Sequence, residues 1–215
     1  MAVCGDFTTK KVPVIGISRH RISTDGDGVT TLVAFHGCPL CCRYCLNPQS
    51  LGNADAYSAY SPEDIYSIVR VDELYFLASG GGVTFGGGEP ALHPRFISEF
   101  RRLCGNDWKI NVETSLNVPS ENIVALLGSV NTFIIDIKDL NSEIYKRYTG
   151  RNNDLVINNL RLIADAGRQN DCFIRLPLIP DFNTDIDRDT SRKYLEALGF
   201  TRFNSFTYKT KVTQL

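Results

Sequence analysis

The sequence contains no hydrophobic run long enough to cross a bilayer. Its longest apolar stretches, such as residues 133–135, are far shorter than the roughly 20 residues that a membrane-spanning helix needs. Residues 1–11 lack the apolar core behind a basic start that a secretory signal carries. We therefore expect a cytoplasmic protein that does not associate with a membrane.

An excess of positive charge is also missing, because the formal net charge is -1 at pH 7. Neutralising a phosphate backbone requires a clear basic excess, so the composition predicts that the protein does not bind nucleic acid. Short basic clusters occur at residues 10–11, 19–21 and 101–102. Clusters of this size usually lie on solvated faces, and we expect the same here.

The chain has no internal repeat, low-complexity tract or linker that would divide it. With 215 residues, of which 43% are hydrophobic, it is long enough for one domain with a substantial core and too short for two. We expect a single, monomeric domain over residues 1–215. Within it, an N-terminal segment (1–28) precedes the strands and helices of residues 29–209.

Four of the seven cysteines lie in one loop, residues 38–45, directly after an apolar run. A disulfide framework would spread its cysteines along the chain, so this grouping indicates a metal site in a reducing compartment. Zinc sites built from two CxxC pairs usually separate the pairs by roughly 15 to 20 residues, and here the separation is zero. The other arrangement is CxxxCxxC, in which Cys38, Cys42 and Cys45 bind three irons of a 4Fe-4S cluster. Cys41 is then a spare thiol.

Short apolar strands alternate with helical patterns from residue 29 onward, which predicts an α/β fold with a parallel sheet. One helix is expected to begin after the N-cap Ser61 and to continue through Leu74 and Leu77. Others are expected to be capped by Ser120 and Thr184. Six strands are predicted, at residues 30–35, 83–85, 109–113, 131–138, 172–176 and 203–208.

Asp136 and Lys138 share one face of the fourth predicted strand, because side chains alternate along a strand. Ile135 and Ile137 then point toward covering helices, and the acid and the base face the interior. A buried lysine needs a carboxylate partner, so a structural ion pair would explain these two residues without any ligand. Arg175, among apolar neighbours on the fifth strand, is expected to face the same interior.

Residues 86–89, Gly-Gly-Gly-Glu, follow the second predicted strand, where a phosphate-binding loop could lie. No Lys-Ser or Lys-Thr follows, and the pattern is neither Walker A nor Rossmann, so nucleoside triphosphate binding is not predicted. Glycines without Cβ let a ligand approach the backbone, and Glu89 can accept hydrogen bonds from an ammonium group. A tight turn with a solvated Glu89 is the alternative.

The CxxxCxxC loop, with the aromatic Tyr44 before its last cysteine, resembles that of the radical S-adenosylmethionine (SAM) superfamily. Residues 25–31, 37–40, 44–48 and 80–90 are also similar to the glycyl-radical-enzyme activating enzymes, of which pyruvate formate-lyase activating enzyme is typical. The resemblance implies an open, TIM-like (β/α)6 partial barrel with its site at the C-terminal ends of the strands. It also implies that Cys38, Cys42 and Cys45 hold a 4Fe-4S cluster whose free iron binds SAM.

Several further residues receive a role from this resemblance alone. Lys138 resembles the residue that meets the SAM carboxylate, and Asp136 helps to shape the same pocket. Glu113 and Thr114 resemble an Asp-Thr pair that contacts SAM or a monovalent cation. The other positions expected to contact the cofactors are Tyr44, Cys45, Leu46, Gly87, Gly88, Glu89, Arg175 and Lys209.

The sequence departs from the activating enzymes at four positions. Leu46 stands in place of His, Gly86 in place of Ser, Thr30 in place of Arg, and Lys209 in place of His. Leu46 and Lys209 lie where adenosine or the substrate would be contacted. They therefore bear on the substrate rather than on the cluster.

The resemblance predicts an enzyme that cleaves SAM reductively to a 5'-deoxyadenosyl radical and installs a glycyl radical on a partner enzyme. No side-chain acid or base is required as a catalyst, because the cluster and SAM carry the chemistry. A flavodoxin- or ferredoxin-type protein is the expected reductant. Two alternatives remain open: a small radical SAM enzyme acting on a metabolite, nucleotide or peptide, and a non-catalytic zinc or iron-sulfur interaction module.

Overall fold

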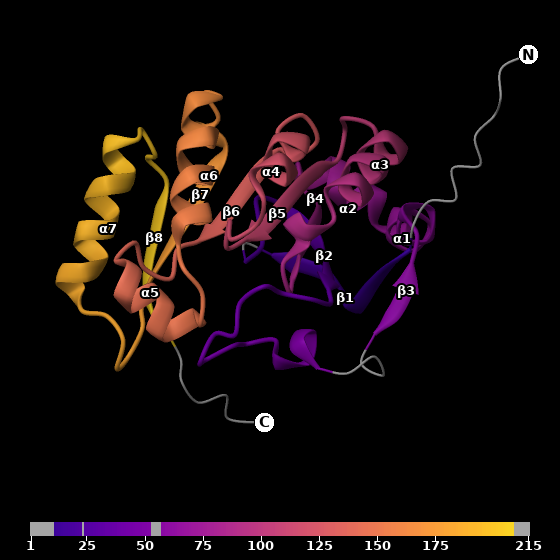
Figure 1. The fold of residues 1–215 in the computed structure, drawn as a ribbon. Helices are drawn as coiled ribbons and strands as arrows, with labels where there is room; N and C mark the ends of the chain where they lie inside the picture. Colours follow the sequence, from indigo (N-terminus) through magenta and orange to yellow (C-terminus); the bar gives the residue numbers. More distant parts are fainter. Residues whose placement is uncertain (1–10, 23, 53–56, 209–215) are drawn as a thin grey trace, which may run out of the picture.

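The computed structural model describes residues 11–22, 24–52 and 57–208, which form a mostly parallel sheet packed against helices (Figure 1). Six strands of the sheet are parallel to one another, and the sequence predicted all six within two residues at either end. They are β2 (Val29–Phe35), β4 (Gly82–Gly87), β5 (Lys109–Thr114), β6 (Thr132–Asp136), β7 (Cys172–Leu178) and β8 (Phe203–Thr207). The predicted parallel sheet is confirmed.

Two antiparallel strands extend the sheet beyond β2, and the sequence analysis predicted neither. β1 (Val12–Ile22) pairs with β2, and the short β3 (Ser58–Tyr60) pairs with the beginning of β1. Within the described residues the strand order is β3-β1-β2-β4-β5-β6-β7-β8. Part of the segment that we had placed before the barrel therefore belongs to the sheet itself.

The basic cluster in β1 lies largely on an exposed face, as expected, and its side chains are also tied to the protein. Arg19 Nε donates to Asp72 Oδ2 at 2.7 Å, and His20 Nε2 lies 2.9 Å from Asp72 Oδ1. The Asp72 side chain is completely buried and also accepts a bond from Thr31. Arg21 forms an ion pair with Asp25. The contacts with Asp72 hold β1 against the turn between the first two helices.

The first helix, α1 (Pro62–Val69), begins with a capping box between Ser61 and Asp64, as its sequence predicts. Its predicted continuation is wrong, because a 3₁₀ turn over Arg70–Asp72 interrupts it before α2 (Glu73–Ser79). The interruption turns Leu74 outward, where it is 80% exposed, and places Phe76 in the core instead.

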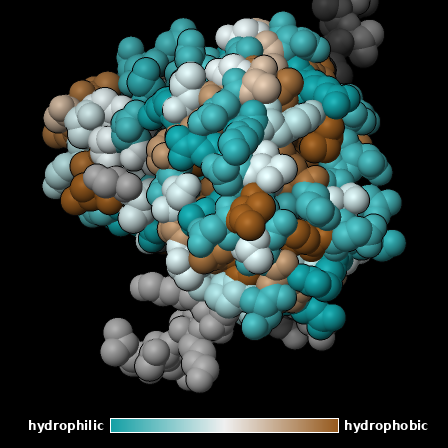
Figure 2. All heavy atoms as spheres, turned by 90° about the vertical axis from the view of Figure 1, so that its left-hand side faces the viewer, coloured by the Kyte–Doolittle hydropathy of each residue, from teal (hydrophilic) through white to brown (hydrophobic). Residues whose placement is uncertain are grey.

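The remaining helices cover the parallel strands. They are α3 (Pro94–Cys104), α4 (Ser120–Leu126), α5 (Ser142–Thr149), α6 (Asp154–Asp165) and α7 (Asp185–Ala197). Thr184 and Asp187 cap α7 as predicted, whereas Pro119 rather than Ser120 is the N-cap of α4, and α5 was not predicted. Among the described residues, no helix combines the length and apolarity needed to cross a membrane. Hydrophilic side chains cover much of the side on which α7 lies (Figure 2).

The turn between β1 and β2 packs inside the barrel at the N-terminal end of the parallel strands. Asn111 Nδ2, in the middle of β5, donates to the Asp25 carbonyl at 3.2 Å, and Thr84 of β4 donates to the same oxygen. Asp25 itself is buried. This turn fills the interior at the N-terminal ends of the strands. The space for a ligand therefore lies at the opposite end, beyond the C-terminal ends of the strands.

Candidate functional site

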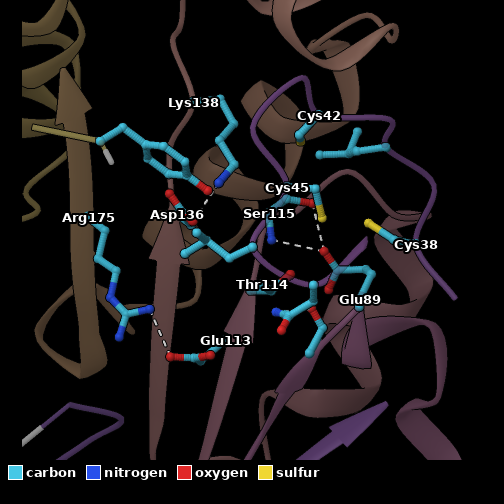
Figure 3. A pocket seen from close by; sticks show the side chains of 16 residues that line it. Cys38, Cys42, Cys45, Glu89, Glu113, Thr114, Ser115, Asp136, Lys138 and Arg175 are labelled. Atoms are coloured by element: carbon cyan, nitrogen blue, oxygen red, sulfur yellow. Dashed lines mark hydrogen bonds and ion pairs between the residues drawn. The ribbon is translucent and has the colours of Figure 1, made fainter. Parts of the chain in front are cut away.

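A cavity opens at the C-terminal ends of the parallel strands (Figure 3). The loop after β2, the glycine run at the end of β4 and the ends of β5, β6 and β7 all contribute to it. Figure 3 shows the three predicted cluster cysteines on one side of the cavity and Glu113 with Arg175 on the other. Its lining residues are Cys38, Leu40, Cys42, Cys45, Leu46, Asn47, Gly87, Gly88, Glu89, Glu113, Thr114, Ser115, Asp136, Lys138, Arg175 and Tyr208.

All the predicted site residues except Tyr44 and Lys209 line this cavity. Lys209 falls outside the described residues. Tyr44 packs instead against Tyr148 and Phe182, and its hydroxyl donates to Asp181 at 3.1 Å. Sequence reasoning missed several lining residues, among them Leu40, Asn47, Ser115 and Tyr208. The position of Ser115 and Tyr208 directly after a strand could have identified them, because strand ends meet at this rim.

The three thiols of CxxxCxxC reach the cavity, whereas Cys41 is exposed and does not line it. Burial raises the pKa of Cys38 to about 12, and the nearby Glu89 adds to the effect. Burial likewise raises the pKa of Cys42 to about 11, although Lys138 opposes the shift. Both thiols are therefore protonated at neutral pH in the metal-free protein, and a metal that binds them must displace protons.

The cysteine loop is held by backbone hydrogen bonds to segments on either side. Gly37 N donates to Ser50 O at 2.9 Å, Cys41 N to Thr149 O at 2.9 Å, and Arg43 N to Tyr148 O at 3.1 Å. The last two acceptors lie at the C-terminal end of α5, where helix carbonyls lack partners within the helix. The helix that the sequence analysis missed is thus a main support of the cysteine loop.

Two glycines bring the backbone after β4 against this loop. Gly87 has a φ of +89°, which favours glycine, and a Cβ on Gly88 would lie 2.2 Å from Gly37 O. The close approach allows Gly88 N to donate to Phe35 O and Glu89 N to donate to Gly37 O, both at 2.8 Å. The glycine run and the cysteine loop therefore form one continuous wall of the cavity.

Glu89 is buried, which excludes the solvated turn that we considered as an alternative. Its Oε2 accepts bonds from Ser115 N at 2.9 Å and Ser115 Oγ at 2.6 Å, and its Oε1 accepts from Ala91 N at 3.2 Å. Burial raises the pKa of Glu89, and these bonds oppose the shift. The Thr114 side chain also donates to the Glu89 carboxyl, so donors from both neighbouring loops fix its position at the edge of the cavity.

Asp136 and Lys138 form the ion pair expected from their shared face, with Lys138 Nζ 2.5 Å from Asp136 Oδ2. Burial alone would lower the pKa of Lys138, but Asp136 and Cys42 more than offset it, and the pKa lies above its usual value. The ammonium also lies 5.7 Å from the centre of the Tyr208 ring. Asp136 Oδ1 is buried and has no hydrogen-bond partner among the described residues, which leaves an acceptor beside the cavity.

Glu113 and Arg175 form a second ion pair, with Arg175 Nη1 2.8 Å from Glu113 Oε1. Arg175 Nη2 also donates to Thr24 O at 2.7 Å, which links the cavity to the turn inside the barrel. A Cβ on Gly86 would lie only 2.7 Å from Glu113 Oε2. The absence of a side chain at Gly86 therefore makes room for the Glu113 carboxylate.

The residues present fit a cluster with an open coordination position. Three soft thiols face one cavity, as a 4Fe-4S cluster with three protein ligands requires. Among the described residues, no group of three His, Cys, Asp or Glu side chains converges to hold a single metal ion. The free Asp136 Oδ1 and the buried ammonium of Lys138 supply an acceptor and a donor next to the thiols. This donor set suits a ligand that carries both an amino group and a carboxylate.

Comparison with known proteins identifies two activating enzymes of related sequence. The (2S)-3-sulfopropanediol dehydratase activating enzyme of Klebsiella oxytoca is 33% identical over 150 residues, covering 67% of this chain and 47% of that protein. The pyruvate formate-lyase-activating enzyme of Clostridium pasteurianum is 31% identical over 159 residues, covering 73% of this chain and 64% of that protein. The chain thus spans between about half and two thirds of the length of these relatives.

The fold is shared with solved structures of low sequence identity. SuiB of Streptococcus suis bound to S-adenosylmethionine aligns with a TM-score of 0.64 and 18% identity, over 85% of this chain and 43% of that one. QueE from Escherichia coli aligns with a TM-score of 0.51 and 14% identity, over 92% of this chain and 95% of that one. A model of the radical SAM superfamily matches residues 32–192, which is most of the sequence. This chain therefore belongs to the radical SAM superfamily, whose cofactors are a 4Fe-4S cluster and SAM.

Proposed function

We propose that the protein cleaves SAM reductively and installs a glycyl radical on a partner enzyme. The observation that carries the first part is the convergence of Cys38, Cys42 and Cys45 with Lys138 and the Gly-Gly-Glu run on one cavity. The second part rests on the names of the relatives, which are activating enzymes of a dehydratase and of pyruvate formate-lyase. These relatives also align over most of the present chain.

In this proposal the three cysteines hold the cluster, and other residues of the cavity orient SAM. When bound, the cluster supplies one electron to the sulfonium of SAM, which yields methionine and a 5'-deoxyadenosyl radical. Lys138 would bind the SAM carboxylate, and Glu89 and Gly87 would receive its amino group. Asp136 orients Lys138 through the ion pair at 2.5 Å.

The walls of the cavity would protect a reactive species from water. The turn around Asp25 fills the barrel interior at the N-terminal ends of the strands. At the other end, Leu40 and Tyr208 contribute buried apolar surface to the cavity. Excluding water from such a site prevents side reactions of a reactive intermediate. The hydrogen donor must therefore be brought to the cavity, which suits a backbone segment of a partner.

The decisive experiment is anaerobic cluster reconstitution, reduction with dithionite and detection of 5'-deoxyadenosine by mass spectrometry. We expect turnover of SAM to methionine and 5'-deoxyadenosine. Lys138→Ala should reduce this turnover about a hundredfold while the iron content stays the same, because the lost interaction involves a buried charge worth about 3 kcal/mol. A fully loaded cluster that never cleaves SAM would favour the interaction module.

The partner is tested in the same reaction by adding candidate glycyl radical enzymes. A glycine-centred doublet in the electron paramagnetic resonance spectrum, together with stoichiometric 5'-deoxyadenosine, is the expected result. SAM cleavage without this signal for any candidate would instead favour a metabolite, nucleotide or peptide as the hydrogen donor.

A further inference from the structure

Three acids in the barrel interior each have a basic partner supplied by the chain itself. The ion pairs are Arg21 with Asp25, Arg175 with Glu113, and Lys138 with Asp136. Burial raises the pKa of Glu113, and Arg175 opposes this shift. Asp25 and Asp136 raise it further, so both acids lie close enough to act on Glu113. The pair of Arg175 and Glu113 therefore stands between two other acids.

The guanidinium of Arg175 is held from two sides. Its Nη1 lies 2.8 Å from Glu113 Oε1, and its Nη2 donates to Thr24 O at 2.7 Å. Both side chains of the ion pair are only 21% exposed. In the ladder between β6 and β7, Arg175 also stands directly beside Asp136. A fixed positive charge is thus placed among the three acids.

Glu113 and Thr114 are the residues that the resemblance links to SAM or a monovalent cation, and their contacts do not fit a cation. A hard cation is held by several oxygen ligands at once. Glu113 Oε1 is instead engaged by Arg175. Thr114 Oγ1 accepts from Leu116 N at 2.9 Å, and the same hydroxyl donates to Glu89. The two side chains that would share a cation therefore each bond to groups of the protein.

An ion pair that only stabilises the fold is the simplest explanation of these contacts, and the position of the pair argues against it. Arg21 and Asp25 form such a pair away from the cavity, whereas Arg175 and Glu113 both line it (Figure 3). Among the described acids that line the cavity, only Glu89 has no basic partner, and the proposed function gives it the SAM amino group. Once that ammonium group is bound, every acid of the cavity faces one positive charge.

We propose that Arg175 is a positioning residue that supplies, through Glu113, the positive charge that a monovalent cation would bring to this cavity, so that SAM binds without K⁺ or Na⁺. This inference rests on the proposed function, because it concerns how the same cavity holds SAM. Carboxylates that lie close together repel one another, and a cation placed among them stabilises their charged forms. Arginine suits this position, because it stays charged and its planar group bonds two acceptors at once.

Binding of SAM to the cluster-loaded protein, measured by anaerobic isothermal titration calorimetry, tests the proposal without any turnover. The solutions contain KCl, NaCl or tetramethylammonium chloride at one ionic strength of about 100 mM, so that general screening is equal. Tetramethylammonium is too large to enter between the side chains. We expect the dissociation constants of the unaltered protein in the three salts to agree within about twofold. An affinity about fivefold or more lower in tetramethylammonium chloride would overturn the proposal.

Substitution of Arg175 should create the dependence that the unaltered protein lacks. Arg175→Gln should raise the dissociation constant of SAM about tenfold or more in tetramethylammonium chloride, and KCl or NaCl should recover most of this loss. Arg175→Lys keeps the charge and should remain insensitive to the salt. The matched control is Arg102→Gln, because Arg102 is 76% exposed in the last turn of α3. It should bind SAM as the unaltered protein does in each salt.

The outcomes separate the inference from the proposed function. Equal weakening of Arg175→Gln in all three salts would mean that the ion pair only stabilises the fold, and would overturn the proposal. If Arg175→Gln does not fold, the unaltered protein and Arg175→Lys still decide, because a requirement for K⁺ or Na⁺ in either contradicts the proposal. Binding and cleavage of SAM that require K⁺ would leave the proposed function standing and overturn the inference about Arg175. Absence of SAM binding in every salt would instead count against the proposed function itself.

Discussion

At the scale of single residues, Gly86 and Glu113 together determine how Arg175 is held in the cavity. A Cβ at Gly86 would lie 2.7 Å from Glu113 Oε2 and 3.0 Å from Leu32 Cδ1. Gly86→Ala should therefore displace the Glu113 carboxylate from Arg175 and lower the free energy of unfolding by about 1 to 3 kcal/mol. Shortening the acid with Glu113→Asp in the same chain should restore part of this loss. A double-mutant cycle by chemical denaturation measures the coupling, and additive effects would contradict it.

The cysteine loop allows a matched pair of substitutions. Cys42→Ala should abolish assembly of a normal 4Fe-4S cluster, because Cys42 faces the cavity with Cys38 and Cys45. Cys41→Ala should leave assembly unchanged, since Cys41 is exposed and does not reach the cavity. Iron and sulfide analysis with the visible absorption spectrum distinguishes the two variants. Loss of assembly in both variants would instead indicate two CxxC pairs, in which Cys41 and Cys42 are both ligands.

Spacing predicted which side chains meet, but not how each is engaged. Asp136 and Lys138 could be placed on one face because the period of a strand fixes their direction. The bonds from Ser115 to Glu89 could not be predicted, since they join two loops that only the sheet brings together. Tyr44 does not line the cavity, and its ring packs instead against Tyr148 and Phe182. The cofactor contacts of all these residues stay predictions.

At the scale of secondary-structure elements, Asp72 joins β1 to the turn between α1 and α2. Its bond from Arg19 lowers the pKa of Asp72, so the folded state binds the proton less tightly than the unfolded state does. The resulting stability is present above the unfolded pKa of about 4 and is lost as the pH falls through that value toward the folded pKa. Asp72→Asn should therefore lower the free energy of unfolding by about 2 to 3 kcal/mol at neutral pH, and by less as the pH falls below about 4.

Chemical denaturation of the metal-free protein at several pH values measures this difference. Asp107→Asn is a suitable control, because Asp107 is exposed and makes no ion pair within the described residues. The control should differ from the unaltered protein by less than about 0.5 kcal/mol. A difference at Asp72 that stays constant with pH would mean that the carboxylate acts through packing and not through its charge.

Element prediction succeeded where apolar periodicity was continuous. Strands β2, β4 and β5 are largely buried, which gives them apolar runs with clear ends, whereas β8 at the edge of the sheet is more exposed. β1 escaped prediction because its register shifts between Ser18 and Arg21, where His20 has a φ of 57°, and because Arg-His-Arg resembles a surface segment. α5 escaped because it is short and its buried residues are Tyr145, Tyr148 and Thr149 rather than aliphatic residues.

For the whole molecule, the core and the cysteine loop should differ in local stability. Strands β4, β5 and β6 contain fully buried residues such as Phe85, Val112 and Phe133, whereas residues 41–49 include many exposed positions. Hydrogen exchange in the metal-free protein should be slowest in these strands and fast in the loop. Cluster assembly should slow exchange in the loop and at the end of α5, and leave the strands nearly unchanged. Mass spectrometry of the two forms provides the comparison, and slowing throughout the sheet would mean that the core itself depends on the cluster.

The hydrogen bonds between the cysteine loop and α5 also impose an order on the maturation of the protein. Cys41 and Arg43 bond to Thr149 and Tyr148, which lie more than 100 residues later in the chain. During synthesis the four cysteines leave the ribosome long before these acceptors exist, so the loop emerges without its main support. Contacts between residues so distant in sequence form late in folding. Iron and sulfide can therefore be inserted into a correctly shaped loop only after most of the barrel has been made.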